Sequence, residues 1–506
     1  MVQVSPTYDV VIVGAGVGGG AMANRLAKNG AKVLLIERGT RLPREADNWS
    51  VKAVFHDKRY ATTETWRDRM GAEFRPSTYY YVGGNSKFFG AATLRFRVED
   101  FGPLQHEAGV SPAWPISYAE LAPYYDIAEQ WMGTHGTAGQ DPCEPPRSGP
   151  MPHPAIGHEP EIEEIGRRLC EKGLRPFPLP IAVDRHPGGG CIRCGTCDGF
   201  ACKLGAKNDA EVRLIDPALA TGNVDLLLEA KVERIITDMS GKRVESIEVE
   251  QKGDRTLIKI GRLIVSSGAV NSAALLLRSA NDKHPRGLGN NQSDQLGRNY
   301  MAHNNTAMMA VNPLQKNRVV FQKSMCINDF YLANSVAHYP LGNVQGLGKL
   351  QGGMLTANMK LMPEWLMSWF AERSVDWWIM SEDLPDPNNR VSIDTDGKIR
   401  LSYKPNNMVS HQQLVAHWTS VMRSLGYPII ISQKMDIKVA MHQCGTVRFG
   451  SDPATSVLDS HCRVWDIDNL YVVDASFMPS STALNPSLTI VAQAIRTADH
   501  MIVQRS

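Results

Sequence analysis

The sequence predicts an α/β fold, α+β overall, in which a parallel sheet formed by distant parts of the chain is combined with an antiparallel sheet. The first observation is an apolar strand at Val10–Val13, followed by a glycine cluster, a helix and a second apolar strand. The second is a series of short apolar runs separated by turn residues between positions 305 and 430. The third is the segment 469–474, which again has the pattern of a buried strand ending in an acid.

The segment Tyr8–Gly39 has the pattern of a dinucleotide-binding unit. Gly14, Gly16 and Gly19 form G-x-G-x-x-G between the first strand and the helix, and Glu37 ends the second strand. Glycine allows a tight turn and a close approach to a pyrophosphate, which binds at the helix N-terminus, while the acid accepts hydrogen bonds from the ribose. A lone G-x-G-x-x-G is a weak signal, but here strand, helix and terminal acid are all present. This unit therefore predicts a Rossmann-like domain.

Composition restricts the class of protein. The chain has 506 residues, of which 43% are hydrophobic and 21% charged, so it is long enough for two or three globular domains. A formal net charge of +2 gives no reason to expect a nucleic-acid partner. We expect no membrane span, because no apolar run approaches about 18 residues. The N-terminal residues lack the basic and apolar regions of a secretory signal, so we expect a cytoplasmic location.

The remaining elements follow from hydrophobic periodicity and turn residues. The sequence predicts helices at Asp126–Met132, Ser272–Ser279 and Thr489–Gln504. Strands are expected at Val224–Ile235, Arg262–Ser266 and Asn469–Asp474. The antiparallel sheet is expected to contain Met308–Val311, Met325–Tyr331, Val391–Ile393 and Ile399–Tyr403. Residues 134–160, rich in Gly, Pro and His, are expected to form an extended surface connection.

Four of the nine cysteines are clustered. Cys191, Cys194, Cys197 and Cys202 have the spacing C-x2-C-x2-C-x4-C, which by itself is compatible with an iron–sulfur cluster or a zinc site. The last interval and the following Lys203 differ from the bacterial ferredoxin pattern, which has x3 and a proline there. We therefore expect structural thiols or a disulfide, with iron–sulfur and zinc as alternatives, and no catalytic metal.

Several separated motifs together resemble the glucose–methanol–choline (GMC) family of flavoprotein oxidoreductases. They occur in the family's order along nearly the whole chain: the N-terminal glycine motif, Val82–Ser86, Trp114–Tyr125, Ser267–Ser272, Leu288–Asn290 with Gly297–Asn299, Asp386–Val391, His442–Thr446, Asp474–Ser476 and Asn485–Thr489. Within the family, the turn from Gly83 to Thr93 is most similar to the pyranose oxidases and bacterial glycoside 3-oxidases.

The resemblance implies FAD as the cofactor and a division of the chain into two domains. Residues 1–105, 190–305 and 431–506 would form the discontinuous FAD-binding domain; 106–189 and 306–430 would form the substrate-binding domain and connections. The residues implied in FAD binding are Gly14, Gly16, Gly19, Glu37, Arg38, Gly84, Asn85, Ser86, Val232, Asp474, Ala475, Pro486 and Thr489. For Asp474 a simple helix N-cap is an alternative. Phe88 stands where pyranose oxidases attach FAD to a histidine, so we expect non-covalent binding.

The resemblance also places a catalytic pair at His442 and Asn485. Oxidation of an alcohol removes a hydride, which a flavin accepts, and a hydroxyl proton, which a neutral histidine accepts. An asparagine cannot deprotonate a substrate, so His442 is assigned as the base and Asn485 as the group that holds the substrate oxygen.

Three hypotheses follow for the activity. The first is oxidation of a secondary ring hydroxyl of a sugar or glycoside to a keto-sugar, with oxygen or another electron acceptor. The second is a dehydrogenase for a non-sugar alcohol or sterol with a quinone or cytochrome acceptor, possibly through an iron–sulfur cluster at Cys191–Cys202. The third is a non-catalytic redox relay, which the His442–Asn485 pair disfavours because a relay needs no base. The sequence makes no prediction about oligomeric state.

Overall fold

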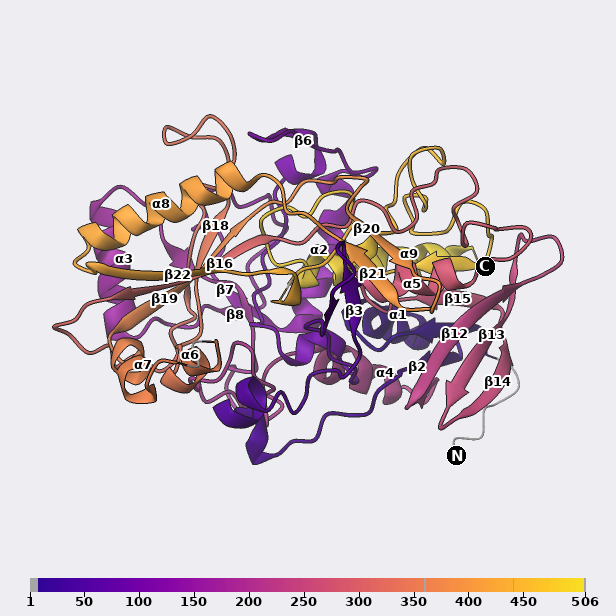
Figure 1. Ribbon diagram of the computed structural model, residues 1–506, viewed down its shortest axis with the longest axis horizontal. Helices are drawn as coiled ribbons and strands as arrows, with labels where there is room; N and C mark the ends of the chain where they lie inside the picture. Colours follow the sequence, from indigo (N-terminus) through magenta and orange to yellow (C-terminus); the bar gives the residue numbers. More distant parts are fainter. Residues whose placement is uncertain (1–7, 359–360, 440, 505–506) are drawn as a thin grey trace.

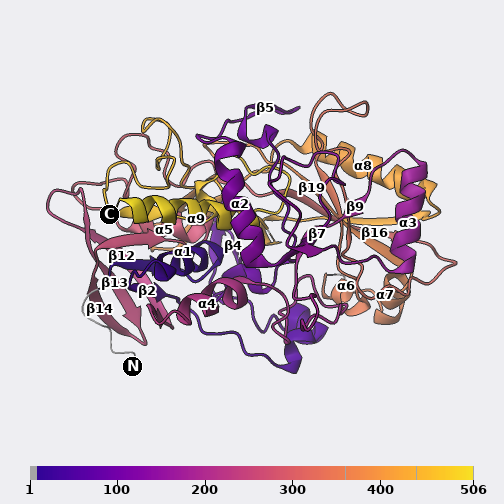
Figure 2. The same ribbon diagram turned by 180° about the vertical axis from the view of Figure 1, so that it is seen from behind.

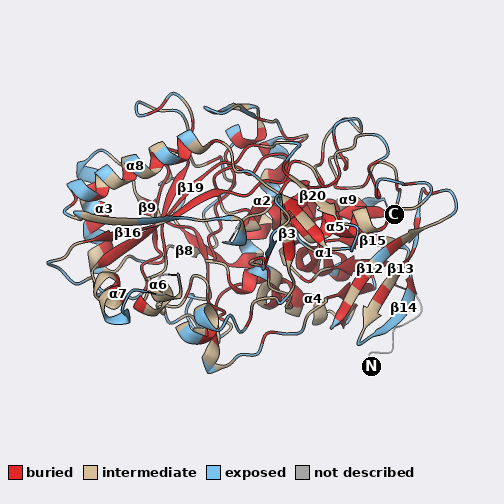
Figure 3. Cartoon of the chain, viewed as in Figure 1, coloured by how far each residue is buried: buried red, intermediate tan, exposed pale blue. Residues whose placement is uncertain are grey.

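The computed structural model describes residues 8–358, 361–439 and 441–504. Two sheets dominate the molecule and lie toward opposite ends of its long axis (Figure 1). A parallel sheet lies near both chain termini, and a larger antiparallel sheet lies at the other end, beside α8 (Met408–Ser424) and α3 (Pro160–Glu171). Buried strands form the interior of both regions, whereas the outer side of α8 is exposed (Figure 3). Among the described residues, no helix is long and apolar enough to cross a membrane.

The parallel sheet has five strands in the order β11-β2-β1-β15-β23. Its strands are β1 (Val10–Val13), β2 (Val33–Ile36), β11 (Val224–Leu227), β15 (Arg262–Val265) and β23 (Leu470–Val472). Most of these strand residues are buried, as expected for a sheet with elements on both faces. Helix α1 (Val17–Lys28) packs against α9 (Ser487–Val503), and α2 (Tyr118–Met132) packs on α9 in turn (Figure 2). Strands β1 and β15 are parallel neighbours, so their carboxyl ends lie together, next to the glycine turn that follows β1.

Glycines allow α1 to lie unusually close to the sheet. A Cβ on Gly19 would be 2.0 Å from the Gly14 carbonyl oxygen, and one on Gly18 would be 2.0 Å from that of Val473. Gly14 itself has φ of +103°, and a Cβ there would be 2.3 Å from the Ser266 oxygen. Any side chain at these positions would therefore push the helix away from the sheet.

The antiparallel sheet has six strands in the order β22-β16-β19-β18-β17-β9. They are β9 (Phe177–Pro178), β16 (Asn304–Val311), β17 (Met325–Ile327), β18 (Asn343–Gly346), β19 (Ser374–Ser381) and β22 (Ile429–Lys434). One face is covered by α3 and α8. On this side the rings of Trp377 and Trp418 pack edge to face, with their centroids 4.9 Å apart. Near the other face, Met309 and Val311 pack in a smaller cluster with Ala371 of α7 (Glu364–Ala371), beside α6 (Gly352–Asn358).

Smaller sheets complete the fold. Their strands are β12 (Ala230–Thr237), β13 (Val244–Gln251) and β14 (Asp254–Lys259); β3 (Trp66–Asp68), β4 (Glu73–Phe74), β20 (Arg390–Ile393) and β21 (Ile399–Ser402); β7 (Thr134–Gly136), β8 (His153–Pro154) and β10 (Ile181–Ala182); and β5 (Leu104–Gln105) with β6 (Val110–Ser111). The remaining helical segments are α4 (Asp216–Leu219), α5 (Ala269–Arg278) and the short turns η1 (Ala46–Trp49), η2 (Lys52–His56), η3 (Gly84–Lys87), η4 (Glu99–Phe101), η5 (Glu211–Ile215), η6 (Ile437–Val439) and η7 (Ala475–Phe477).

Most predicted elements are confirmed, with five corrections. Residues 134–160, expected to form an extended surface connection, contain β7 and β8, which belong to a sheet, and Thr134 and His135 are buried. The expected strand Val224–Ile235 is two strands in different sheets, because the chain turns at Glu229, which has φ of +53°. The helix expected at Asp126 begins at Tyr118, because Ser117 and Glu120 form a capping box there. The strand expected to reach Tyr331 ends at Ile327. The predicted strands Val391–Ile393 and Ile399–Tyr403 form a hairpin that pairs with β3, outside the six-stranded sheet.

Sheet membership bears on the predicted division into domains. The parallel sheet takes strands from three separate parts of the chain, and the six-stranded sheet takes its strands from residues 177–434. The four-stranded sheet combines residues 66–74 with residues 390–402, so elements from both predicted domains pair with each other. The domain boundaries themselves stay a prediction.

Candidate active site

The predicted nucleotide site is an open space in front of helix α1. Gly16 is the N-cap residue of α1, and no side chain caps the helix. A Cβ at Gly16 would meet no atom within 4 Å, in contrast to Gly14, Gly18 and Gly19, where it would collide with backbone. An uncapped helix N-terminus with free space before it is suited to a phosphate group.

A second glycine turn lies directly beside this space. Gly83 and Gly84 both have positive φ, and a Cβ on Gly84 would be 3.4 Å from the Cα of Gly16. Two hydrogen bonds of the Ser86 side chain fix the turn. Ser86 Oγ donates to the Gly83 carbonyl oxygen at 2.5 Å and accepts from Ala210 N at 3.0 Å. Asn85 Oδ1 accepts from Tyr79 N at 3.0 Å. The predicted cofactor residues of these two turns thus lie together.

Two buried acids stand at the ends of parallel strands. Glu37 accepts from Ala15 N at 3.1 Å and from Gly39 N at 2.9 Å, and burial raises the pKa of its carboxyl group. Asp474 accepts from Gly268 N at 3.0 Å and caps η7 through Ser476 N at 2.8 Å; burial raises the pKa of Asp474 as well. Asp474 therefore has the N-cap role that the sequence left as an alternative. Both oxygens of Glu37 and Oδ1 of Asp474 retain a lone pair for a further donor, whereas Asp474 Oδ2 also accepts from Ser272 Oγ at 2.5 Å.

The other predicted cofactor residues are distributed around these turns. The guanidinium carbon of Arg38 lies 3.8 Å from the centroid of the Tyr80 ring, and a guanidinium nitrogen of Arg38 forms an ion pair with Glu64 Oε2 at 3.2 Å. Val232 lies in β12 beside a break in the register with β13. The remaining three are at the carboxyl end of the parallel sheet and the start of α9: Ala475, Pro486 and Thr489.

These residues fit FAD. Open space at Gly16, the adjoining turn at Gly84 and the acid at Glu37 provide what a dinucleotide's pyrophosphate and ribose need. Phe88, the predicted marker of non-covalent binding, is stacked on Tyr79 at 3.9 Å and is buried. Its side chain offers no nucleophile to a flavin.

The predicted catalytic pair is brought together in space. Asn485 Nδ2 lies 3.4 Å from His442 Nε2, although 43 residues separate them in the chain. Cys444 exchanges two backbone hydrogen bonds with Met301, and Gly445 N donates to the Ala475 carbonyl at 3.2 Å, which fixes the segment that carries His442. His442 has φ of +60°, an uncommon conformation for a residue other than glycine. Such backbone strain is concentrated at functional sites.

A second histidine, which was not predicted from the sequence, contacts the first. His303 Nδ1 lies 2.9 Å from His442 Nδ1, and His303 Nε2 lies 2.9 Å from the Ser481 carbonyl oxygen. The two rings pack edge to face, with their centroids 4.7 Å apart. No motif in the sequence marks His303, which is one of 14 histidines and precedes β16 without distinctive neighbours.

Electrostatics favour neutral histidines at this site. Burial lowers the pKa of His442 well below its usual value, and the neighbouring His303 and Lys323 lower it further. Burial lowers the pKa of His303 to about 4, although the Ser481 carbonyl and Glu382 oppose the shift. A neutral imidazole at neutral pH can accept a proton, which is the requirement for a general base.

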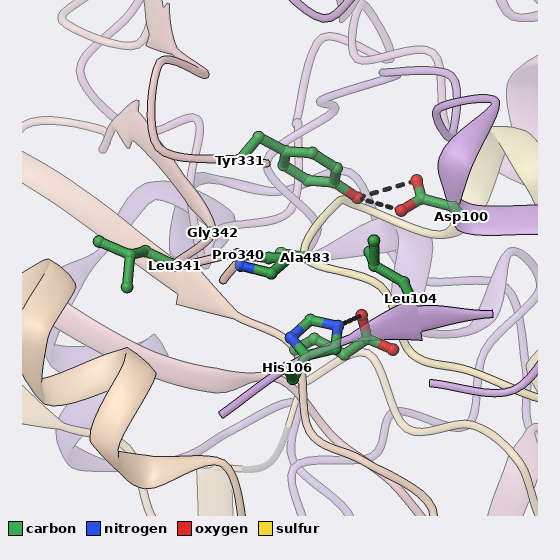
Figure 4. A pocket seen from close by; sticks show the side chains of 9 residues that line it. Asp100, Leu104, His106, Tyr331, Pro340, Leu341, Gly342 and Ala483 are labelled. Carbon is green, nitrogen blue, oxygen red and sulfur yellow. Dashed lines mark hydrogen bonds and ion pairs between the residues drawn. The ribbon is translucent and has the colours of Figure 1, made fainter. Parts of the chain in front are cut away.

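A pocket that contains Asp100 and Glu382 is lined in part by Ala483, which belongs to the segment that carries Asn485 (Figure 4). Tyr331 donates to Asp100 and is 2.9 Å from Oδ1, and His106 Nε2 is 3.0 Å from a Glu382 carboxylate oxygen. Burial raises the pKa of Asp100 to about 7. The polar groups of this pocket are largely paired with each other, so they support the adjoining segment.

The cysteine loop Cys191–Cys202 lies against the Phe88–Phe89 turn. Lys207, which is buried, donates to the carbonyl oxygens of Phe89, Cys197 and Phe200 at 2.7–2.9 Å and so ties the loop to the turn. All nine cysteines fall within the described residues and are free thiols, and the described residues contain no group of three or more His, Cys, Asp or Glu arranged to hold a metal ion. The thiol pKa is raised by burial at Cys191 and, to about 12, at Cys197.

A glycine cradle suited to a dinucleotide, together with a buried histidine–amide pair, is the arrangement expected of a nucleotide-dependent oxidoreductase. The sequence matches the GMC oxidoreductase family over residues 81–304 and 405–494, and the pyridine nucleotide-disulphide oxidoreductase family over residues 8–61. This chain belongs to the GMC oxidoreductase family and is an FAD-dependent enzyme that oxidises CH–OH groups.

Three relatives illustrate the family. The chain is similar to the paromamine 6'-oxidase of Streptomyces fradiae, at 32% identity over 97% of this chain and 90% of the relative. It is 30% identical to the 6'''-hydroxyparomomycin C oxidase of Streptomyces lividus, over 99% of this chain and 93% of the relative. The crystal structure of pyridoxine 4-oxidase from "Mesorbium loti" has the same fold, with a TM-score of 0.67 and 18% identity over 98% of this chain and 99% of that one.

Proposed function

We propose that this enzyme oxidises a hydroxyl group of a sugar or glycoside, with His442 as the base and Asn485 as the group that holds the substrate oxygen. The observation that carries the proposal is the 3.4 Å approach of Asn485 Nδ2 to His442 Nε2. A hydroxyl group that lies within hydrogen-bond distance of both accepts from the amide and donates to the imidazole. When bound, the flavin supplies the acceptor for the hydride from carbon.

The residues proposed to hold FAD are those of the two glycine turns and the strand ends, which include Gly16, Gly84, Glu37 and Asp474. We propose that the cofactor is bound without a covalent bond, because Phe88 is an inert, stacked side chain. Acid precipitation of the purified protein should release all the yellow colour into the supernatant. Colour that stays in the pellet would contradict this part of the proposal.

The substrate class rests on the relatives. The names of the two Streptomyces relatives specify oxidation of paromamine and of a paromomycin, and a third relative, 26% identical, is the fructose dehydrogenase large subunit of Gluconobacter japonicus. We propose a secondary ring hydroxyl as the site of oxidation, giving a keto-sugar. A second candidate is a primary 6-type hydroxyl of an amino sugar, which the names of the two relatives at 30% and 32% identity favour.

Anaerobic reduction of the flavin by a small panel of alcohols distinguishes these possibilities. Methyl β-D-xyloside has only secondary hydroxyls, methyl β-D-glucoside adds a primary one, and paromamine adds amino groups. Reduction by the xyloside supports the secondary-hydroxyl proposal, whereas reduction by the other two alone favours the primary position. Reduction by a sterol with none of the sugars would contradict the proposed substrate class. Reoxidation by oxygen compared with a quinone then identifies the electron acceptor.

A further inference from the structure

The Nδ1–Nδ1 contact between His303 and His442 determines which nitrogen of the base is free. His303 Nε2 lies 2.9 Å from the Ser481 carbonyl oxygen, which can only accept. His303 Nε2 must therefore carry the hydrogen. A neutral imidazole carries one hydrogen, so His303 Nδ1 has a lone pair and is an acceptor.

The 2.9 Å contact between the two Nδ1 atoms needs one hydrogen, and His303 cannot supply it. His442 Nδ1 must therefore be the donor, which leaves its Nε2 with a lone pair. Asn485 Nδ2, the only donor group of that side chain, lies on this nitrogen at 3.4 Å, and an amide N–H directed at a lone pair is the favourable arrangement.

From this chain of contacts we infer that His303 is a positioning residue that holds His442 in the tautomer with Nδ1–H and a free Nε2. The order is Ser481 carbonyl, His303, His442, Asn485. Hydrogen bonds at one ring nitrogen commonly set the protonation state of the other. His303 is buried and neutral, so its Nδ1 remains an acceptor before and after Nε2 of His442 takes the substrate proton. The inference rests on the proposed role of His442 as the base.

The structure provides a matched control in His411. This residue is also a buried neutral histidine with a pKa lowered by burial to about 4, and its ring nitrogens contact Thr306 Oγ1 at 2.8 Å and Ser381 Oγ at 3.0 Å. Thr306 lies on β16 and Ser381 on β19. Strand β16 begins at Asn304, the residue that follows His303, so both histidines lie close to this strand in the chain or in space. Among the described residues no hydrogen bond joins His411 to His442, so loss of His411 should affect packing and leave the tautomer unchanged.

Nuclear magnetic resonance of histidine-selective ¹⁵N-labelled holoenzyme tests the inference directly. The His442 signals, identified by their loss in His442→Gln, should show hydrogen on Nδ1 and none on Nε2. In His303→Phe the two tautomers should mix, whereas His411→Phe should leave the His442 signals unchanged. Hydrogen on Nε2 in the wild-type protein, or an unchanged tautomer in His303→Phe, would overturn the inference.

Stopped-flow flavin reduction by methyl β-D-glucoside provides a second readout. His303→Phe should retain FAD and lower the reduction rate at least about tenfold, part of the contribution of a general base. His303→Gln offers an amide oxygen to His442 and an N–H to Ser481, so it should restore most of that loss. His303→Phe with an unchanged rate would contradict the inference alone, whereas an unchanged rate in His442→Ala would contradict the proposed function.

Discussion

The nucleotide cradle and the histidine site are built in opposite ways. The centre of the cradle is the local glycine motif at the start of α1, and its shape depends on what the glycines lack: a Cβ at Gly19 would be 2.0 Å from a carbonyl oxygen, whereas one at Gly16 would meet no atom within 4 Å. The histidine site depends on what the side chains contribute, and its members come from three distant segments. Backbone space thus defines the first region and side-chain polarity the second.

The strongest test of this contrast compares two alanine substitutions in the same motif. Gly19→Ala should prevent stable folding, at a cost of about 3 kcal/mol or more, because the new methyl collides with the Gly14 carbonyl. Gly16→Ala should leave the stability of the FAD-free protein within about 0.5 kcal/mol, since its Cβ meets no atom. Thermal unfolding and flavin absorbance measure the two effects. Gly16→Ala should bind FAD at least about tenfold more weakly, and equal FAD affinity would show that the pyrophosphate lies elsewhere.

In the histidine site, removal of a side chain should abolish chemistry without affecting the cradle. His442→Ala should retain its FAD and lose about 10²–10⁴ in the rate of flavin reduction, the usual contribution of a general base. Flavin absorbance checks cofactor content, and stopped-flow reduction by methyl β-D-glucoside checks the rate. A variant that loses its FAD instead would mean that the two regions are not separable.

Removal of the amide should have a smaller effect. Asn485→Ala leaves the proton acceptor in place and removes only the donor that holds the substrate oxygen. We expect a rate lower by about tenfold, comparable to the loss of one hydrogen bond of about 1.4 kcal/mol. Asn485→Asp is the informative companion in the same stopped-flow assay, because its carboxylate cannot donate and should be no better than alanine. A fully active Asn485→Asp enzyme would contradict the assigned role.

The smallest effect on flavin reduction is expected at His411, which supports the fold and has no part in the proposed chemistry. Its pKa is lowered by burial to about 4, so below pH 6.5 the unfolded chain binds a proton that the folded protein does not. Stability should therefore fall as pH decreases from 6.5 toward 4, by up to about 3 kcal/mol from this residue. His411→Phe should be less stable at pH 7, and urea unfolding at several pH values should show this difference shrinking toward pH 4. A difference that stays constant with pH would contradict the neutral assignment.

The same contrast explains how far the sequence could be interpreted. The strand, glycine turn, helix and acid from Val10 to Glu37 are local, so periodicity and glycine spacing predicted them in their order, and the first strand has the predicted bounds. The pair of His442 and Asn485 was predicted only through the resemblance to a family. His303 could not be found, because its role arises when the Cys444–Met301 pairing brings two segments together. The hairpin β20–β21 was assigned to the wrong sheet for a similar reason: its partner strand β3 is more than three hundred residues away in sequence.

The pH dependence of flavin reduction tests the central claim, that His442 Nε2 takes the substrate proton. A base acts in its neutral form, so the rate should rise with pH through the pKa of His442 and then stay constant. Burial, with His303 and Lys323 nearby, places that inflection below the usual value of about 6.5. Wild-type enzyme and Asn485→Ala should both show the inflection, and His442→Ala should show none. An inflection that persists in His442→Ala and disappears in Asn485→Ala would contradict the assignment.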